Sequence, residues 1–80
     1  MASVIEEIKK AGKEKKLITI SYRKVSGEIS TSDVESYEIK GIYFWAVDTV
    51  DNGIRQFKLN NILSVEILDE TYTPQFPVKF

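Results

Sequence analysis

The chain contains no cysteine and no histidine among its 80 residues. Without cysteine it can form no disulfide, no thiolate metal site and no cysteine nucleophile. Without histidine it lacks the usual general base at neutral pH and the commonest metal ligand in proteins. We therefore predict a protein that is not an enzyme and that uses no metal and no cofactor.

An excess of charge of either sign is also missing, because 11 Lys and Arg face 12 Asp and Glu, for a net charge of −1. Such a balance gives no global attraction to nucleic acid or to an anionic membrane, although a local basic patch remains compatible with it. No apolar run reaches membrane-spanning length, and the N-terminus lacks the apolar segment of a signal peptide. We expect a single cytoplasmic domain over residues 1–80, with no membrane partner.

The N-terminal segment carries the pattern of a helix start. Ser3, with Glu6 three residues later, fits a capping box, in which the serine oxygen accepts from the backbone N–H of Glu6. Apolar residues then recur at helical spacing, which predicts a helix over about residues 3–14. Five lysines between residues 9 and 16 resemble a nucleic-acid patch, but the neighbouring glutamates dilute them. A solvated helix end is the simpler interpretation of these lysines.

Short runs of β-branched and aromatic residues, separated by turn residues, predict five strands in the rest of the chain. The runs are 17–22, 34–39, 42–49, 54–58 and 63–67. Residues 29–33 are small and polar, so we expect irregular pairing there, and residues 59–62 should form one helical or 3₁₀ turn. Closely spaced antiparallel strands of this length usually curl into a small barrel, expected over about residues 17–68.

The C-terminal residues 69–80 contain Pro74 and Pro77 and are expected to be extended. Phe76, Val78 and Phe80 make this arm apolar. The arm can pack on its own barrel, or it can add an edge to a second copy of the chain. The sequence leaves both arrangements open.

Arg55 falls in phase with Phe57 and Leu59, which by strict alternation places a charge on the apolar face of a strand. One interpretation is a guanidinium at the barrel mouth that grips a phosphate, carboxylate or nucleotide in forked geometry. The other is that Gly53 introduces a bulge, which leaves Arg55 exposed or paired with Asp48 or Glu35.

Three consecutive aromatic residues, Tyr43, Phe44 and Trp45, cannot all face a core, because successive side chains in a strand point to opposite faces. Ile42, Phe44 and Ala46 form the expected core set, which would expose Tyr43 and Trp45. These two rings would then either stack on a base or planar ligand beside Arg55, or be covered by the helix or the arm.

The order of these segments resembles a WYL domain over roughly residues 3–76. The family pattern contains an "I-x-Y" strand, a second strand ending in "R-x-V-x-P", then "W-Y-L-x-A-x-D" and, after a hairpin turn, "R-x-F-x-L-D-R-I". The matching segments here are Ile20-Ser21-Tyr22, Val34-Glu35-Ser36-Tyr37, Ile42-Tyr43-Phe44-Trp45-Ala46-Val47-Asp48 and Arg55-Gln56-Phe57-Lys58-Leu59-Asn60-Asn61-Ile62. The resemblance implies a mainly β fold, a small five-stranded SH3- or Sm-like barrel with one N-terminal α-helix.

Several positions depart from the family pattern. The name-giving tryptophan falls on Ile42, the strand-start arginine on Ser32, the proline on Ser36, and the "D-R" pair on Asn60 and Asn61. Arg55 is the recurring basic position that this chain retains, with Lys58 as a nearby substitute.

The resemblance implies a ligand- or nucleic-acid-binding accessory module, of the kind found in bacterial regulators and phage-defence proteins. The expected partner is a single-stranded nucleic acid or a nucleotide-like ligand. The alternative is a protein-binding or homodimerising module without a small ligand. The predicted contacts are the polar residues Arg55, Lys58, Asn60 and Asn61 and the stacking residues Tyr43 and Trp45.

Overall fold

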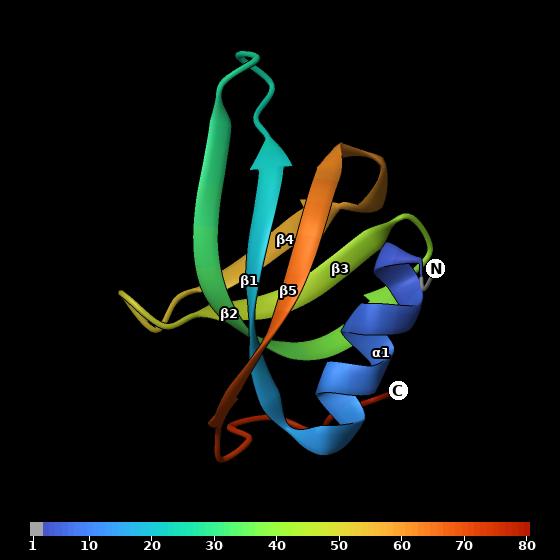
Figure 1. Cartoon of the computed structure of the whole chain (residues 1–80), viewed down its shortest axis with the longest axis vertical. Helices are drawn as coiled ribbons and strands as arrows, with labels where there is room; N and C mark the ends of the chain where they lie inside the picture. Colours follow the sequence, from blue (N-terminus) through green and yellow to red (C-terminus); the bar gives the residue numbers. More distant parts are fainter. Residues whose placement is uncertain (1–2) are drawn as a thin grey trace.

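The computed structural model describes residues 3–80 as one helix and five strands (Figure 1). The elements are α1 (Val4–Glu14), β1 (Lys16–Arg23), β2 (Ile29–Lys40), β3 (Tyr43–Asp48), β4 (Ile54–Lys58), the 3₁₀ turn η1 (Leu59–Asn61) and β5 (Ile62–Thr71). The predicted mainly β class, with one N-terminal helix, five strands and a short turn before the last strand, is confirmed. None of the helices described in residues 3–80 is long and apolar enough to cross a membrane.

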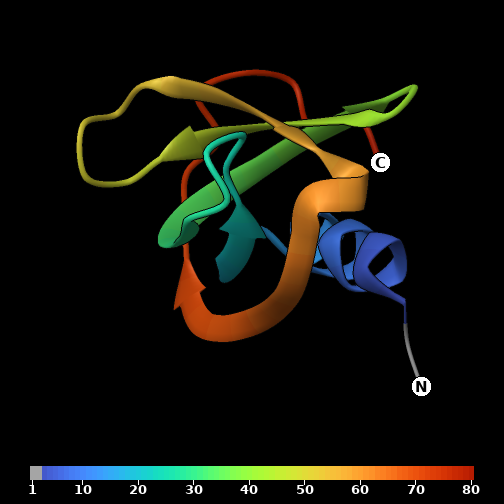
Figure 2. The same ribbon diagram turned by 90° about the horizontal axis from the view of Figure 1, so that it is seen from above.

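The five strands form one antiparallel sheet in the order β4-β3-β2-β1-β5. The sheet curls, so that β3 and β4 cross behind β1 and β5 in Figure 1 and lie above them, in a separate layer, in Figure 2. Within residues 3–80, no pairing joins β4 to β5, so the sheet stays open, and the expected closure into a barrel over about residues 17–68 was wrong. The turn η1 carries the chain from one edge of the sheet to the other without forming a hairpin there.

Strand β2 is continuous with both halves of the sheet and bends at a bulge. Its first half pairs with β1 in regular register from Ile29 opposite Arg23 onward, so the expectation of irregular pairing over residues 29–33 was wrong. The backbone bonds of a hairpin do not require apolar side chains, and the turn at Gly27 sets its register. The irregularity lies instead at Tyr37, the extra residue between the pairs that Ser36 and Glu38 form with β3.

The core lies on the inner, concave side of the sheet, where α1 covers it. Its buried members are Ile8, Ala11, Ile18, Ile20, Val34, Phe44, Ala46, Phe57 and Ile62. Phe44 stacks on Phe57 with ring centroids 6.0 Å apart, which ties β3 to β4. Phe44 and Ala46 are buried as predicted, but Ile42 is 51% exposed. Its expected place in the core was wrong because β3 begins at Tyr43 and Ile42 lies in the preceding turn.

The helix begins as its sequence predicts, because the Ser3 side chain accepts a hydrogen bond from the backbone N–H of Glu6 at 3.1 Å. It ends at Lys15, whose positive φ of 55° directs the chain into β1. The buried Gly12 faces the ring of Phe80, and a Cβ atom at this position would clash with that ring. Glycine is therefore needed here for close packing of the C-terminal end against α1.

The C-terminal arm, residues 72–80, packs on its own sheet. The Lys79 N–H donates to the Tyr37 carbonyl at 2.8 Å, and Lys79 forms a parallel bridge with Glu38. Phe80 packs against the core, and the Tyr72 hydroxyl donates to the Ser36 carbonyl. In the single chain, the arm thus lies on its own sheet, which is one of the two arrangements that the sequence leaves open.

Candidate binding face of the β3–β4 hairpin

The side of β2, β3 and β4 that points away from the core, here called the outer face, is built from three cross-strand rows. Directly paired residues of neighbouring strands have their side chains on the same face. The rows are Lys40–Tyr43–Lys58, Glu38–Trp45–Gln56 and Glu35–Val47–Ile54. The outer face therefore changes from basic and aromatic at the turn between β2 and β3 to acidic and apolar at the opposite end.

The first row places one tyrosine between two lysines. Tyr43 is 38% exposed, and the Lys40 and Lys58 side chains are both exposed. Trp45 follows two residues later on the same strand and the same face, about 7 Å along it. Two aromatic rings at this spacing, with cations on both flanks of the first, form a surface that can stack planar groups and attract phosphate.

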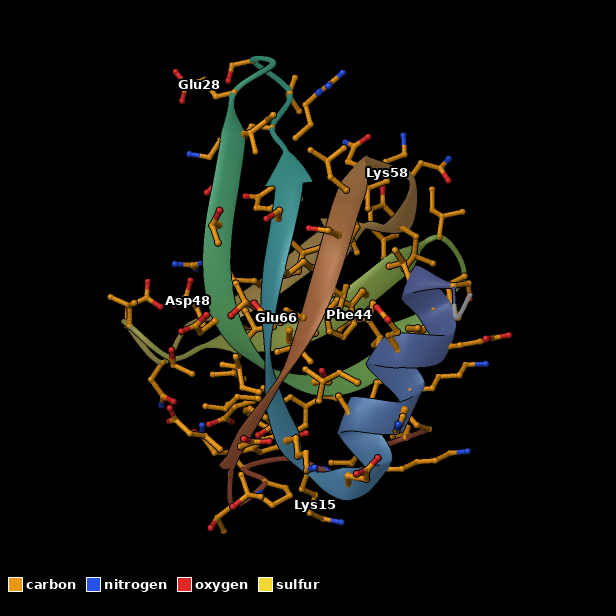
Figure 3. The ribbon with its side chains drawn as sticks, in the orientation of Figure 1. Lys15, Glu28, Phe44, Asp48, Lys58 and Glu66 are labelled. Carbon is orange, nitrogen blue, oxygen red and sulfur yellow. The ribbon has the colours of Figure 1, made fainter. Side chains whose placement is uncertain are left out.

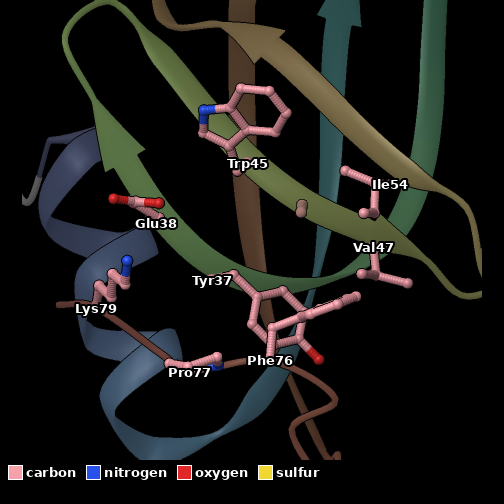
Figure 4. A pocket seen from close by; sticks show the side chains of 9 residues that line it. Tyr37, Glu38, Trp45, Val47, Ile54, Phe76, Pro77 and Lys79 are labelled. Carbon is pink, nitrogen blue, oxygen red and sulfur yellow. The ribbon is translucent and has the colours of Figure 1, made fainter.

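A pocket of about 190 Å³ lies beside Trp45, between the outer face and the C-terminal arm (Figure 4). Its apolar walls are formed by Tyr37, Trp45, Val47, Ile54 and Phe76. Glu38 and Lys79 lie together at one end of the pocket (Figure 4). The pocket combines aromatic walls with one carboxylate and one ammonium group.

The pocket wall at Tyr37 is held by the arm. Tyr37 makes an edge contact with Phe76, with ring centroids 5.5 Å apart. Its hydroxyl donates to Glu35 at 2.6 Å and accepts from the backbone N–H of Gln75 at 2.9 Å. Burial, together with the nearby Glu35 carboxylate, raises the pKa of Tyr37 to about 12. Burial and the Glu35 charge likewise raise the pKa of Tyr72 to about 12, so both tyrosines stay neutral at physiological pH.

Arg55 lies on the other side of the hairpin. It pairs with Ala46, a core residue, so its side chain leaves β4 on the inner face, in phase with Phe57 as the alternation predicts. The register of β3 with β4 shows no bulge in the described residues. Because β4 is an edge strand, the Arg55 side chain still reaches solvent and is 44% exposed.

The guanidinium of Arg55 is already matched by two carboxylates. It donates to Asp51, and its Nε lies 4.0 Å from Oδ2 of the nearly buried Asp48. The backbone N–H of Gly53 and the Arg55 guanidinium hold the pKa of Asp51 below its usual range. The Arg55 charge is therefore balanced by two carboxylates of the same hairpin.

The structure thus distributes the six predicted contact residues over three places. Tyr43, Trp45 and Lys58 share the outer face, while Arg55 lies on the inner face, so neither of the two predicted stacking rings lies beside it. Asn60 and Asn61 lie in η1, which leads away from the hairpin toward β5. These positions bring half of the predicted set together and separate the rest from it.

Sequence reasoning overlooked Lys40 and Glu38, which complete the first two rows of the outer face. The signal was present in Lys40 and Gly41, because a two-residue turn places the residue before Gly41 directly opposite Tyr43. Among residues 3–80, no group of three or more histidine, cysteine, aspartate or glutamate side chains is arranged to hold a metal ion.

Comparison with known proteins places this architecture in a family. The chain is similar over 91% of its length to the solved structure of proteasome accessory factor B/C (PafBC) of Arthrobacter aurescens, with a TM-score of 0.77 and 21% identity. The match spans 13% of that longer chain. At this low sequence identity it shows a likeness of fold alone. No curated protein matches the sequence. The family model of the WYL domain matches residues 3–67, and this chain therefore belongs to the WYL domain family.

Proposed function

We propose that the chain is a non-catalytic regulatory accessory module that binds single-stranded nucleic acid on the outer face of the β3–β4 hairpin. The observation that carries this proposal is the row Lys40–Tyr43–Lys58 with Trp45 beside it. Stacking of one base on an aromatic side chain contributes about 1–3 kcal/mol and tolerates any base. Membership of the WYL family supports the proposal, since these domains are regarded as ligand- or nucleic-acid-sensing modules of bacterial regulators.

The electrostatics of the outer face set the expected strength of binding. Two lysines can each neutralise one phosphate, while the carboxylates of Glu38 in the middle row and Glu35 in the last row repel phosphate groups. The slope of log affinity against log salt should therefore be small, roughly −1.4, or about −0.7 for each of two phosphate contacts on a single strand. Weak, salt-sensitive binding fits a module whose net charge is −1.

Fluorescence tests this proposal directly, because Trp45 is the sole tryptophan of the chain. Single-stranded oligonucleotides of about eight nucleotides would be titrated at two salt concentrations while Trp45 emission is followed. We expect quenching that weakens as salt rises, and loss of most of this binding in the double variant Lys40→Ala/Lys58→Ala.

Arg55→Ala is the matched control, since it removes one positive charge from the opposite face of the same hairpin. It should leave the titration unchanged. Absence of quenching at low salt, or a larger loss in Arg55→Ala than in the lysine variant, would reject the outer face as the nucleic-acid site.

A protein-binding or self-associating module is the second candidate. Ile54 and Phe76 are 57% and 47% exposed beside the pocket, which gives the outer face an apolar end. Association through such residues should persist at high salt. A mass above that of one chain in light scattering, reduced by Ile54→Ser, would favour this candidate.

A further inference from the structure

We propose that the pocket beside Trp45 takes one splayed-out cytosine of the bound strand, with the Glu38 carboxylate accepting a hydrogen bond from its N4 amino group. The inference rests on the proposed function and adds a base preference to it. This cytosine pocket gives a role to three features that the basic row does not involve, namely the pocket, Glu38 and the C-terminal arm.

The size of the pocket fits a single six-membered ring. Apolar cavities of about 150 Å³ are large enough to bind benzene. The pocket here measures about 190 Å³, which leaves room for a pyrimidine with its substituents and is tight for a bicyclic purine. Trp45 and Phe76 lie on opposite sides of the pocket in Figure 4, so an inserted ring would have aromatic contact on both sides.

The polar end of the pocket presents an acceptor. Glu38 is opposite Trp45 in the sheet register, and in Figure 4 its carboxylate lies at the same end as the Lys79 ammonium. An ionised carboxylate can only accept hydrogen bonds. Cytosine offers the N4 amino donor at this edge, whereas thymine and uracil offer the O4 acceptor, which a carboxylate repels. Lys79 can meet a phosphate beside the inserted base.

Glu38 is also the carboxylate that remains available at the pocket. Among residues 3–80, the ion pairs include none to Glu38. Glu35 instead accepts hydrogen bonds from Tyr37 and Gln75, and the Tyr37 hydroxyl is itself engaged by Glu35 and by the backbone N–H of Gln75. The Tyr37 ring therefore serves as a wall of the pocket, and base recognition falls to Glu38.

Homopolymers of deoxycytidine and deoxythymidine, each of about eight nucleotides, test the inference by Trp45 fluorescence at low salt. The wild-type chain should bind oligo(dC) about tenfold more tightly than oligo(dT), the ratio expected for one hydrogen bond that specifies a base. Glu38→Gln should reduce this ratio to about one, because an amide can donate to thymine O4 as well as accept from cytosine N4.

Glu66→Gln is the matched control, because it removes the same charge from an exposed position on β5 (Figure 3), and Glu66 is not among the residues that line the pocket. It should keep the preference for oligo(dC). As a second variant, Phe76→Ala removes an exposed wall of the pocket and should lower the preference while leaving the salt dependence due to Lys40 and Lys58 intact.

The outcomes separate the two proposals. Equal binding of oligo(dC) and oligo(dT) by the wild-type chain, or a preference that survives Glu38→Gln, would overturn the cytosine pocket and leave the outer face as a non-specific site. Absence of binding to both homopolymers would overturn the proposed function itself.

Discussion

The two faces of the β3–β4 hairpin use their charges differently. On the inner face, the cation of Arg55 is matched by Asp48 and Asp51 within the protein. On the outer face, the ion pairs of residues 3–80 include neither Lys40 nor Lys58, and both flank an exposed tyrosine. Both faces thus carry positively charged side chains, an arginine on one and two lysines on the other. The difference teaches that internal pairing, more than the presence of an arginine, decides which face has charge to offer a ligand.

The largest expected effect is a difference in the stability lost when a side chain is truncated on one face or the other. Phe44→Ala, on the inner face, should lower the free energy of unfolding by about 3–5 kcal/mol, because it leaves a cavity in the core. Tyr43 is the neighbouring residue and lies on the outer face, so Tyr43→Ala should lower the free energy of unfolding by less than about 1 kcal/mol. Urea denaturation of both variants provides the measurement. Similar losses for the two would contradict the assignment of faces.

The attachment of the arm to the outer side can be weakened by high pH. Tyr37 and Tyr72 have folded-state pKa values of about 12, raised from 10, so the native state favours their neutral form. Their stabilisation is fully present below about pH 10, the pKa of the unfolded chain, and is lost as pH rises through about 12. The free energy of unfolding should therefore fall across this range, as thermal denaturation at a series of pH values would show.

The matched control for this pH effect is Tyr37→Phe, which keeps the ring and removes the titrating group. Titration of the lysines is common to both proteins and cancels in the comparison. The variant should show a shallower loss between pH 10 and 12. An identical slope in the two proteins would mean that Tyr37 does not contribute to it.

The packing of the C-terminal arm against α1 can be tested at Gly12, which faces the ring of Phe80. Gly12→Ala should destabilise the wild-type chain by about 1 kcal/mol, because loss of Phe80 packing exceeds the gain in helix propensity. In a Phe80→Ala background the same change should instead stabilise the protein by about 1 kcal/mol. Chemical denaturation of the four proteins measures this reversal. If Gly12→Ala changes the free energy of unfolding in the same direction in both backgrounds, the Phe80 ring does not restrict the size of the side chain at residue 12.

The smallest expected effect concerns a polar atom left in the core. The buried Oγ of Ser36 has no hydrogen-bond partner among residues 3–80. A buried hydroxyl without a partner carries an uncompensated desolvation penalty, and its removal should relieve this penalty. Ser36→Ala is therefore expected to raise the free energy of unfolding by about 1 kcal/mol. The exposed Ser64→Ala serves as the comparison and should change stability little. A loss of stability in Ser36→Ala would indicate that the hydroxyl is satisfied.

The sequence predicts the elements of this fold well. The capping residue Ser3, the alternating strand between Tyr43 and Asp48 and the turn before Ile54 all follow local rules that the structure obeys. Closure into a barrel could not be predicted from these rules, because it depends on whether two strand edges meet in space.

The candidate site was less predictable, because it depends on relations across strands. Alternation places Arg55 on the inner face, but it does not show that the turn directs Asp51 back onto its guanidinium. Alternation alone would place Glu35 and Glu38 on opposite faces, since they are three residues apart. The bulge at Tyr37 puts both on the outer face, and no local sequence signal marked it.

That bulge makes the length of β2 as informative as its composition. Deletion of Tyr37 would remove the extra residue, and strict alternation would then keep every following side chain of β2 on its present face up to the turn. Glu38 and Lys40 would still point outward beside Trp45 and Tyr43, and Ile39 would still pack against the core. A one-residue deletion would therefore leave the core and the three outer rows in place and would remove one wall of the pocket, together with the Tyr37 contacts that hold the arm.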